Sequence, residues 1–328
     1  MTDPSHGTGR SPHLNTWLHA IQTPLGDRLY RTVTTVCAAT IPLVLVLLTA
    51  VVLRAAWPAL SLHATDLAFG TTWDVPRAQF GAFPAIAGTL LSSLIALCLA
   101  APLALGVAIF TVDIGPRRLR EPVAFLVNLL AAIPSVVYGL WGVFVLVPLL
   151  RRTIMPALVP LGSFLPIVRG PAYGPSLIAA SLLLGIMILP YIASISRDVL
   201  LAVPHAQREA ALALGATRWE VVRDAVLPAA RSGLIGGVML GLGRALGETL
   251  AVTMVIGNRH AIPDSLFDPA YTMASLLANE FAEASSDAHL SALMAVAALL
   301  LLITLLINLL ARWLVRRVAT GLPGGRSR

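Results

Sequence analysis

The sequence predicts an all-α integral membrane protein with six transmembrane helices. Hydrophobic residues occupy 57% of the 328 positions, and charged residues only 12%. Soluble domains carry roughly a quarter of their residues as charged side chains, so this chain is too apolar for that class. Six separate segments also reach the ~20 apolar residues that a helix needs to cross a bilayer.

The six predicted spans differ in composition. The first and last are rich in Leu, Val and Ala, whereas the middle four also contain Gly, Pro, Ser and Thr, as helices in close contact do. In the fifth span glycines recur every fourth residue, which permits close packing within this chain or against a second subunit. The predicted spans are residues 32–53, 83–112, 123–150, 176–195, 233–256 and 290–315.

The arginine distribution orients these spans. All 23 basic residues are arginine, and most fall in segments that share one side of the membrane if both termini lie in the cytoplasm. Cytoplasmic loops carry the excess of positive charge, so we predict a multi-pass protein of the bacterial cytoplasmic (inner) membrane with both termini inside. Arg151 and Arg152 go against the trend, on the predicted outer side. Because the arginines are spread over separate loops, we expect the lipid bilayer, and no nucleic acid, as a partner.

The spans divide the chain into regions, and two outer loops carry further expectations. Residues 61–82 are long enough for a small surface helix, with Phe69, Trp73 and Phe80 at the lipid interface. Residues 151–175 are rich in proline and glycine, which predicts irregular structure. The regions are a cytoplasmic N-terminal tail at 1–31, the first span and its extracytoplasmic loop at 32–82, a core of five spans at 83–315 and a cytoplasmic C-terminal tail at 316–328.

The absence of lysine excludes one function for this chain. A P-loop ATPase holds the nucleotide phosphates with the Lys of its Gly-rich loop, and this sequence contains no lysine. If ATP drives the protein, ATP and Mg²⁺ are therefore expected on a separate ATPase subunit. No His and Cys cluster has metal-ligand spacing, and Cys37 and Cys98 lie in apolar runs. We expect no cofactor, no metal and no catalytic residue on this chain.

A polar stretch between the fourth and fifth spans is predicted to form a helix-turn-helix on the cytoplasmic surface. Pro204 suits the first position of a helix, and Gly215 suits a stop in left-handed geometry. Thr217 and Glu220 have the spacing of a capping box for a second helix. That second helix is expected to end before Pro228.

This helix-turn-helix has two interpretations. One is an amphipathic hairpin that lies at the membrane interface. The other is a docking element, because Ala210, Ala211, Ala213 and Ala216 form a low surface that suits a protein groove better than lipid. A membrane protein that grips a soluble partner in this way can receive energy from that partner.

Arg244 and Glu248 are four residues apart in the fifth span, so they are predicted to share one face of its helix. Charged side chains within a span cost about 2.5–3.5 kcal/mol each on insertion scales. One interpretation is a self-neutralising pair that stabilises the bundle. The other is a substrate pathway, in which Arg offers a donor fork to an oxyanion and Glu accepts a hydrogen bond from a protonated phosphate. Thr249 and Thr253 extend this polar stripe, although Thr253 can equally bond back to its own helix.

Pro134 lies inside the third predicted span, where it is expected to kink or break the helix. A break at membrane depth is tolerated only where protein or water covers it. We therefore predict that Pro134 and Ser135 line the pathway. Tyr138 and Trp141 are expected to be packing residues or interface anchors.

The polar loop also carries a resemblance to a known family. It is similar to the EAA motif of binding-protein-dependent ABC importer permeases, in which an EAA triplet is followed by a glycine and later by Leu-Pro. In that family the loop is the coupling helix that sits in a cleft of the ATPase subunit. The resemblance implies a type I importer permease of MetI-like fold, with an ATPase-coupling loop at 203–228. The matching residues are Glu209, Ala210, Ala211, Gly215, Leu227 and Pro228.

Longer segments resemble the permeases of the phosphate-specific importer, and PSVVYGLWG together with GRALGETLAVTMVIGN looks like the PstC type. The resemblance implies uptake of inorganic phosphate, with Arg244 and Glu248 in the pathway. It also implies a PstA-type second permease, two PstB-type ATPase subunits and an extracytoplasmic PstS-type phosphate-binding protein. The segments are residues 80–97, 129–146, 188–200 and 241–258.

Two alternatives remain open at this point. A permease for molybdate, sulfate or phosphonate would share the architecture, although a fully deprotonated anion has no proton to offer Glu248. An ATP-independent carrier or a membrane enzyme would need no ATPase partner.

Overall fold

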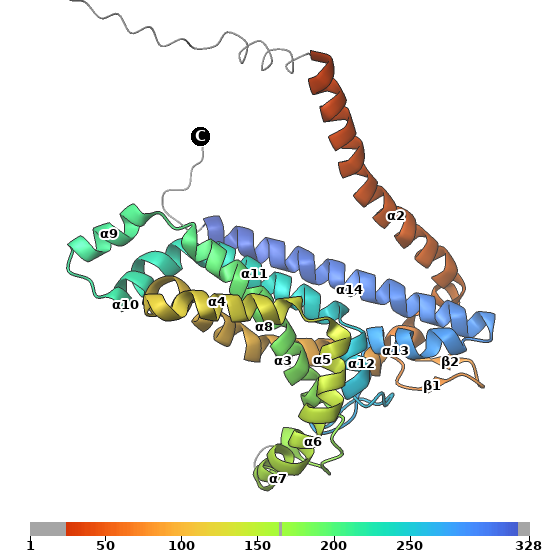
Figure 1. Cartoon of the computed structure of the whole chain (residues 1–328). Coiled ribbons are helices and arrows are strands. Elements are labelled where there is room, and N and C mark those ends of the chain that lie inside the picture. Colours follow the sequence, from red (N-terminus) through yellow and green to blue (C-terminus); the bar gives the residue numbers. More distant parts are fainter. Residues whose placement is uncertain (1–23, 164–165, 321–328) are drawn as a thin grey trace, which may run out of the picture. The chain divides into compact units, whose positions relative to one another are not determined.

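The computed structural model describes residues 24–163 and 166–320. These residues are almost entirely helical, and six helical segments are long and apolar enough to cross a membrane (Figure 1). The predicted all-α class with six spans is therefore confirmed. Most of both predicted tails, at 1–31 and 316–328, lies outside the described residues.

Contacts divide the chain into two units, Met1–Arg54 and Ala55–Arg328. Helix α2 (Pro24–Phe69) contains the first predicted span and is much longer than that span. Residues 61–82 were long enough for a small surface helix, and their first part instead continues α2 as far as Phe69. In the first unit, α2 exposes apolar side chains such as Leu43, as a lipid-facing helix does.

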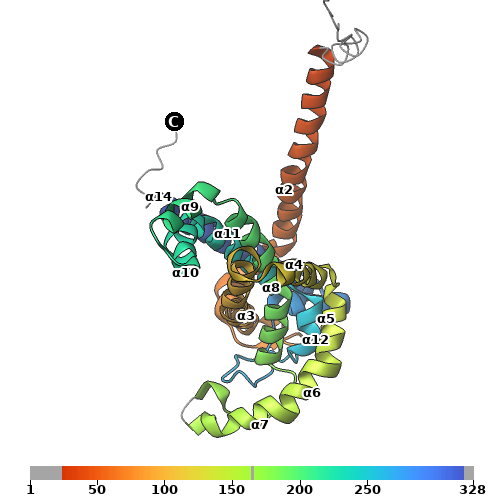
Figure 2. The same cartoon turned by 60° about the vertical axis from the view of Figure 1, so that its left-hand side comes forward.

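Four long helices form the bundle of the second unit (Figures 1 and 2). Helix α8 packs against α3 and α11, and α11 also packs against α14. The predicted second and sixth spans each fall within one of these helical segments, and the fourth begins one residue before its helix. The helices are α3 (Phe83–Ile109), which continues as the π turn η1 (Phe110–Ile114), α8 (Leu177–Leu201), α11 (Leu227–Gly247) and α14 (Asp287–Thr320).

Small residues allow α3 to lie close to α8. Ala96, Ala100 and Ala104 recur every fourth residue on α3, so they share one face, and all three are buried. They belong to the largest apolar cluster, to which α8 contributes buried branched side chains such as Leu184 and Ile188. The core of the molecule is therefore an alanine face on one helix against Leu and Ile on another.

The third predicted span, 123–150, is wrong in its bounds because the chain breaks inside it. Helix α4 (Arg117–Ala132) ends before Ile133 and Pro134, both of which are extended, and α5 (Ser135–Trp141) begins after them. The break follows from the proline ring, which disfavours helical geometry at the preceding residue. The break expected at Pro134 is thus observed.

Beyond α5 the chain stays helical further than expected. We predicted irregular structure throughout 151–175, and this is wrong for the first part, because no glycine or proline lies between Leu150 and Met155. Short 3-10 turns and irregular chain follow. The elements are η2 (Gly142–Leu146), α6 (Val147–Leu149), η3 (Leu150–Ile154), α7 (Met155–Leu158), η4 (Val159–Ser163) and η5 (Pro166–Val168).

Two short strands, β1 (Trp73–Asp74) and β2 (Gln79–Phe80), pair antiparallel with Trp73 opposite Phe80. Both rings, predicted at the lipid interface, are half-buried in the protein. They pack on each other with centroids 5.1 Å apart, and the Phe80 ring stacks on that of His289 at 5.7 Å. The indole N–H has a partner inside the protein, so it does not need the wet membrane surface.

That partner is Glu280 at the end of α13 (Met273–Glu280). Its Oε2 accepts a 2.7 Å hydrogen bond from Trp73 Nε1 and lies 3.0 Å from His289 Nε2. Nearby, His260 Nε2 lies 2.8 Å from the carbonyl oxygen of Gly81. Desolvation by burial lowers the pKa of His260 below its ordinary value, so the neutral imidazole is favoured in the folded chain.

Acidification is expected to destabilise this cluster through His260. The unfolded chain binds a proton near the ordinary pKa of 6.5, and the folded chain binds it only at lower pH. The contribution of neutral His260 is therefore complete above pH 6.5 and is lost as the pH falls below it. His260→Gln should remove this part of the pH dependence of the melting temperature. The exposed His205→Gln is the control and should retain it, and an equal pH dependence in both variants would contradict the assignment.

Candidate functional site

The polar loop is a helix-turn-helix at one end of the bundle (Figure 1). Helix α9 (His205–Ala213) starts after Pro204, which is the N-cap residue and not the first helical residue as we expected. Gly215 has φ +86°, so it forms the predicted left-handed turn. The predicted capping box is also present, with Thr217 and Glu220 bonding each other's backbone N–H.

The second helix of the loop does not end before Pro228, so that prediction is wrong. Helix α10 (Arg218–Glu220) runs through the π turn η6 (Val221–Val226) directly into α11. Pro228 follows the π turn η6 directly, and such a turn already departs from regular α-helical hydrogen bonding, so the proline does not end the helical segment. The loop is therefore joined to the fifth span by one continuous helical segment, Arg218–Gly247.

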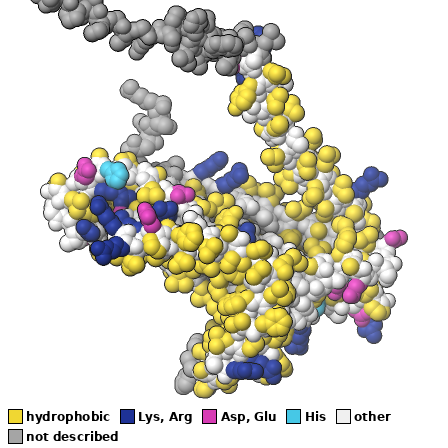
Figure 3. All heavy atoms as spheres, in the orientation of Figure 1, with side chains coloured by type: hydrophobic (Ala, Val, Ile, Leu, Met, Phe, Trp, Pro, Cys, Tyr) yellow, Lys and Arg dark blue, Asp and Glu magenta, His cyan; other side chains and the backbone are white. Residues whose placement is uncertain are grey.

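The outward face of the loop is more apolar than we predicted. Leu214 is 90% exposed at the tip, and Leu212 and Trp219 are about half exposed beside it. Exposed apolar groups of this size mark a surface for a partner. The sequence contained this signal, because these are large apolar residues within an otherwise polar loop. Figure 3 shows arginine side chains gathered over the same end of the molecule.

The motif residues are divided between two faces. Glu209, Ala210 and Gly215 are exposed, whereas Ala211 and Leu227 pack against the apolar cluster beneath the loop. The alanine surface expected on the outside is thus only partly outward, because one stripe of a surface helix, recurring every three to four residues, faces the protein. Ala213 is exposed, Ala216 packs inward and Pro228 is exposed.

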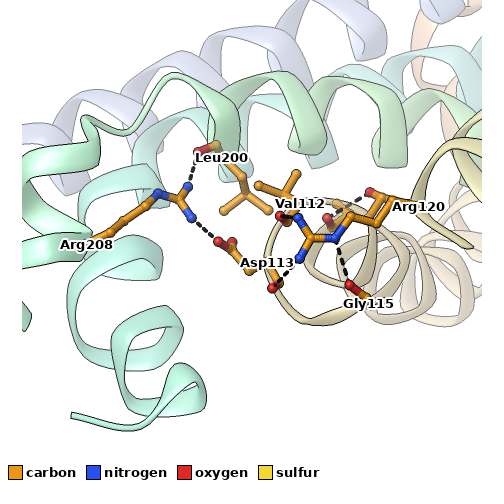
Figure 4. A network of polar contacts seen from close by, with 8 residues as sticks. Val112, Asp113, Gly115, Arg120, Leu200 and Arg208 are labelled. Carbon is orange, nitrogen blue, oxygen red and sulfur yellow. Dashed lines mark hydrogen bonds and ion pairs between the residues drawn. The ribbon is translucent and has the colours of Figure 1, made fainter. Parts of the chain in front are cut away.

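Two arginines and one aspartate, none of them predicted, connect the loop to the bundle (Figure 4). Arg208 of α9 forms an ion pair with Asp113 of η1 and donates a 2.7 Å hydrogen bond to the carbonyl oxygen of Leu200. Arg120 donates to the carbonyl oxygens of Val112, Asp113 and Gly115 at 2.7–2.8 Å. Burial lowers the pKa of Arg208, because its guanidinium loses hydration.

The structure corrects the arrangement expected for Arg244 and Glu248. Helix α11 ends at Gly247, and Glu248 is extended with ψ 126°, so the two side chains do not share a helical face. Among the ion pairs of residues 24–163 and 166–320, none joins them. The guanidinium carbon of Arg244 lies 4.9 Å from the ring centroid of Tyr191 on α8. The self-neutralising pair therefore has no support from the geometry.

Helix α12 (Leu250–Val255) begins after this interruption. Thr249 Oγ1 donates to the carbonyl oxygen of Gly247 at 3.3 Å, and Thr253 Oγ1 donates to that of Thr249 at 2.7 Å. Of the two roles left open for Thr253, the bond back to its own helix is the one observed. The predicted single fifth span, 233–256, consists of two helices.

The two interrupted spans meet. A Cβ added to Gly139 of α5 would lie 3.2 Å from the Cα of Ala251, and one added to Gly142 would lie 2.7 Å from Val255 Cγ1. This register means that α5 and α12 run in the same direction, so their first residues lie at the same end of the pair. Ser135 is one of these first residues, and the break at Pro134 lies beside the break at Glu248 and Thr249.

Tyr138 is buried as a packing residue, and its hydroxyl donates to the carbonyl oxygen of Leu130 at 2.8 Å. Trp141 is 41% exposed.

The glycine repeat of α11 is used within this chain. A Cβ at Gly233, Gly237 or Gly241 would lie 2.5–3.0 Å from a carbon of Val199, Ile195 or Ile192 on α8. Gly236 and Gly247, on other faces, have no atom within 4 Å of an added Cβ. In the described ranges, no group of three His, Cys, Asp or Glu side chains could hold a metal ion.

Comparisons with known proteins identify a family from the sequence and a shared fold from solved structures. Residues 100–320 match the family described as "Binding-protein-dependent transport system inner membrane component". The phosphate transport system permease protein PstC of Mesorhizobium japonicum is 46% identical over 237 residues, 70% of this chain and 72% of that protein. The MetNI methionine ABC transporter in an inward-facing conformation has a TM-score of 0.51 at 20% identity, covering 75% of this chain and 99% of that one. A bacterial ABC transporter that imports the polysaccharide alginate has a TM-score of 0.52 at 18% identity, covering 87% and 98%.

Substituting a packed glycine of α11 is expected to lower stability. A Cβ at Gly241 would lie 2.5 Å from Ile192 Cγ1, so Gly241→Val forces α11 and α8 apart at a cost of about 1–3 kcal/mol. The melting temperature of the purified protein in detergent should fall. Gly236→Val is the matched control on the open face and should melt no lower than the parent, and equal melting of all three proteins would refute the packing described.

Proposed function

Because this chain belongs to the family of binding-protein-dependent transport system inner membrane components, we propose that it is one of two membrane subunits of an ATP-driven importer of inorganic phosphate. Its fold is that of the MetI-like ABC transporter permeases, as predicted. The relatives that share most of its length are named as transport permeases, which accords with a transport subunit and not an enzyme. They include phosphate transport permeases at 42–46% identity, which supports phosphate as the substrate.

One observation supports the coupling of this subunit to an ATPase. The helical segment Arg218–Gly247 runs without a break from the exposed loop to Arg244. The loop at 203–228 is proposed to lie in the cytoplasm, with both termini, and to dock into a separate ATPase subunit through its exposed apolar tip. ATP and Mg²⁺ bind to that subunit, and this chain holds no cofactor.

The proposed pathway lies where two helices are interrupted. Arg244 supplies positive charge for an oxyanion, and Glu248, in extended backbone, accepts a hydrogen bond from protonated phosphate. Thr249 and Ser135 add polar groups beside the breaks, next to Pro134, while Thr253 acts indirectly because its hydroxyl is bonded to its own helix. The proposed complex also contains a PstA-type permease, two PstB-type ATPase subunits and a PstS-type binding protein outside.

Two other functions are distinguishable from this one. A permease for molybdate, sulfate or phosphonate would prefer that anion, and an ATP-independent carrier would transport without ATPase subunits. The uptake test is reconstitution of the complex in vesicles with labelled phosphate, sulfate or molybdate. Uptake of phosphate that requires ATP supports the proposal. Preference for another anion would refute the substrate, and uptake without ATP would refute the mechanism.

Neutralising either pathway charge is expected to impair transport without preventing assembly. Arg244→Gln removes a charge-assisted contact worth roughly 1.5–3 kcal/mol, which is about a ten- to hundredfold loss of phosphate uptake. Glu248→Gln should act in the same direction. The measurement is uptake per assembled complex, with the melting temperature as control. Normal uptake with earlier melting in both variants would mean that the two residues are structural.

Removing the apolar tip of the loop is expected to weaken ATPase binding. Leu214→Ser deletes a side chain whose full burial contributes about 1.5–3 kcal/mol, so the affinity for the ATPase subunit should fall about ten- to hundredfold. Ile262→Ser is the matched control, an exposed aliphatic side chain in the loop between the fifth and sixth spans. Equal affinity of the Leu214 variant and the parent would show that the partner does not cover this tip.

A further inference from the structure

Two parts of the chain that are 95 residues apart in the sequence meet where Arg208 contacts Asp113. Its guanidinium contacts the Asp113 carboxylate at the end of η1 and the Leu200 carbonyl oxygen at the end of α8. Arg120, from the first turns of α4, holds the backbone on both sides of Asp113 through three carbonyl oxygens. The loop helix α9 is thereby connected to the ends of both helices of the tightly packed α3–α8 pair (Figure 4).

Both ends of α9 are points where the backbone turns. Pro204 precedes the helix in extended geometry, and Gly215 follows it in left-handed geometry with no atom within 4 Å of an added Cβ. The covalent chain alone therefore leaves α9 free to swivel against the bundle. Among the side chains of α9 in the described structure, Arg208 alone forms hydrogen bonds or an ion pair. The polar side-chain contacts that hold α9 against the bundle in the described structure therefore depend on Arg208.

The Arg208–Asp113 ion pair is better suited to fixing the relative position of two elements than to stabilising the fold. The side chains of Arg208 and Asp113 are only 14% and 11% exposed, so both charges have lost most of their hydration. Arg208 Nε and Asp113 Oδ2 are buried without a partner in the described residues. A buried ion pair with unsatisfied atoms contributes little net stability, and its best-attested role is to fix the register of two elements.

The two halves of the contact differ in stiffness. Asp113 has a short side chain on a backbone that Arg120 fixes at three points, whereas Arg208 has a long side chain on a helix between two turns. A displacement of α9 therefore also moves η1 and α8. The short side chain of Asp113 cannot absorb the displacement by changing its own conformation.

Resting on the proposed function, we propose that the Arg208–Asp113 ion pair is the positioning contact that transmits movement of the ATPase-docked helix α9 to the α3–α8 pair. It acts beside the covalent route through α10, η6 and α11, which ends at Arg244. Both routes start at the same loop, and the ion pair adds a direct connection from α9 to α3 and α8 beside the packing of α8 on α11. Without the ion pair, ATP hydrolysis continues, but the movement of α9 no longer reaches α3 and α8 directly.

The test removes the interaction without leaving a buried unpaired charge. The double variant Asp113→Asn, Arg208→Gln is neutral at both positions, so it avoids the misfolding that a single variant can cause. In the reconstituted complex with labelled inorganic phosphate, we expect ATP hydrolysis near the parent rate and at least tenfold less phosphate transported per ATP. Arg208→Lys keeps the charge and should retain most of the coupling.

Controls separate this inference from a structural role and from the proposed function itself. The exposed pair Arg77 and Asp74, neutralised by Arg77→Gln and Asp74→Asn, should leave the ratio of phosphate to ATP unchanged. An unchanged ratio in the Asp113→Asn, Arg208→Gln variant, or loss of the assembled complex in both that variant and Arg208→Lys, would overturn the coupling role alone. Failure of the parent complex to take up phosphate with ATP would overturn the proposed function and this inference with it.

Discussion

The close approach of α8 to α3 and α11 determines where each candidate functional side chain lies. Alanines every fourth residue on α3 and glycines every fourth residue on α11 let both helices lie against branched side chains of α8. Because α8 is close to α11, Tyr191 comes under the guanidinium of Arg244. Because α8 is close to α3, Leu200 comes next to Asp113, and one arginine reaches both. A wider spacing would separate both groups of contacts.

The breaks before α5 and α12 lie where this close packing of long helices ends. The first backbone N–H groups of α5 and α12 receive no side-chain cap, and the two helices start side by side. Irregular backbone at membrane depth needs protein or a water-filled cavity around it. The polar side chains of Glu248 and Thr249 are therefore concentrated where the packing of long helices stops.

Local signals in the sequence predicted part of this structure. Gly215, the capping box at Thr217 and the break at Pro134 follow from the backbone preferences of single residues, so they were predictable. The end of α11 at Gly247 was not, because a glycine inside an apolar span is tolerated or not according to its tertiary surroundings. Pro228 did not end the helix as predicted, because it follows the π turn η6, where the helical hydrogen bonding is already irregular. Arg208 and Asp113 are 95 residues apart, and no local pattern joins them.

The unbroken helical segment from the loop to Arg244 has a mechanical consequence. Arg218 and Arg244 are separated by roughly 39 Å at 1.5 Å per residue, which makes the segment a lever. A tilt of about 5° at one end displaces the other by roughly 3 Å over that length, which is about the donor–acceptor distance of one hydrogen bond. A rotation of that size, smaller than the scatter of ordinary helix crossing angles, is enough to separate the Arg244 guanidinium from the Tyr191 ring.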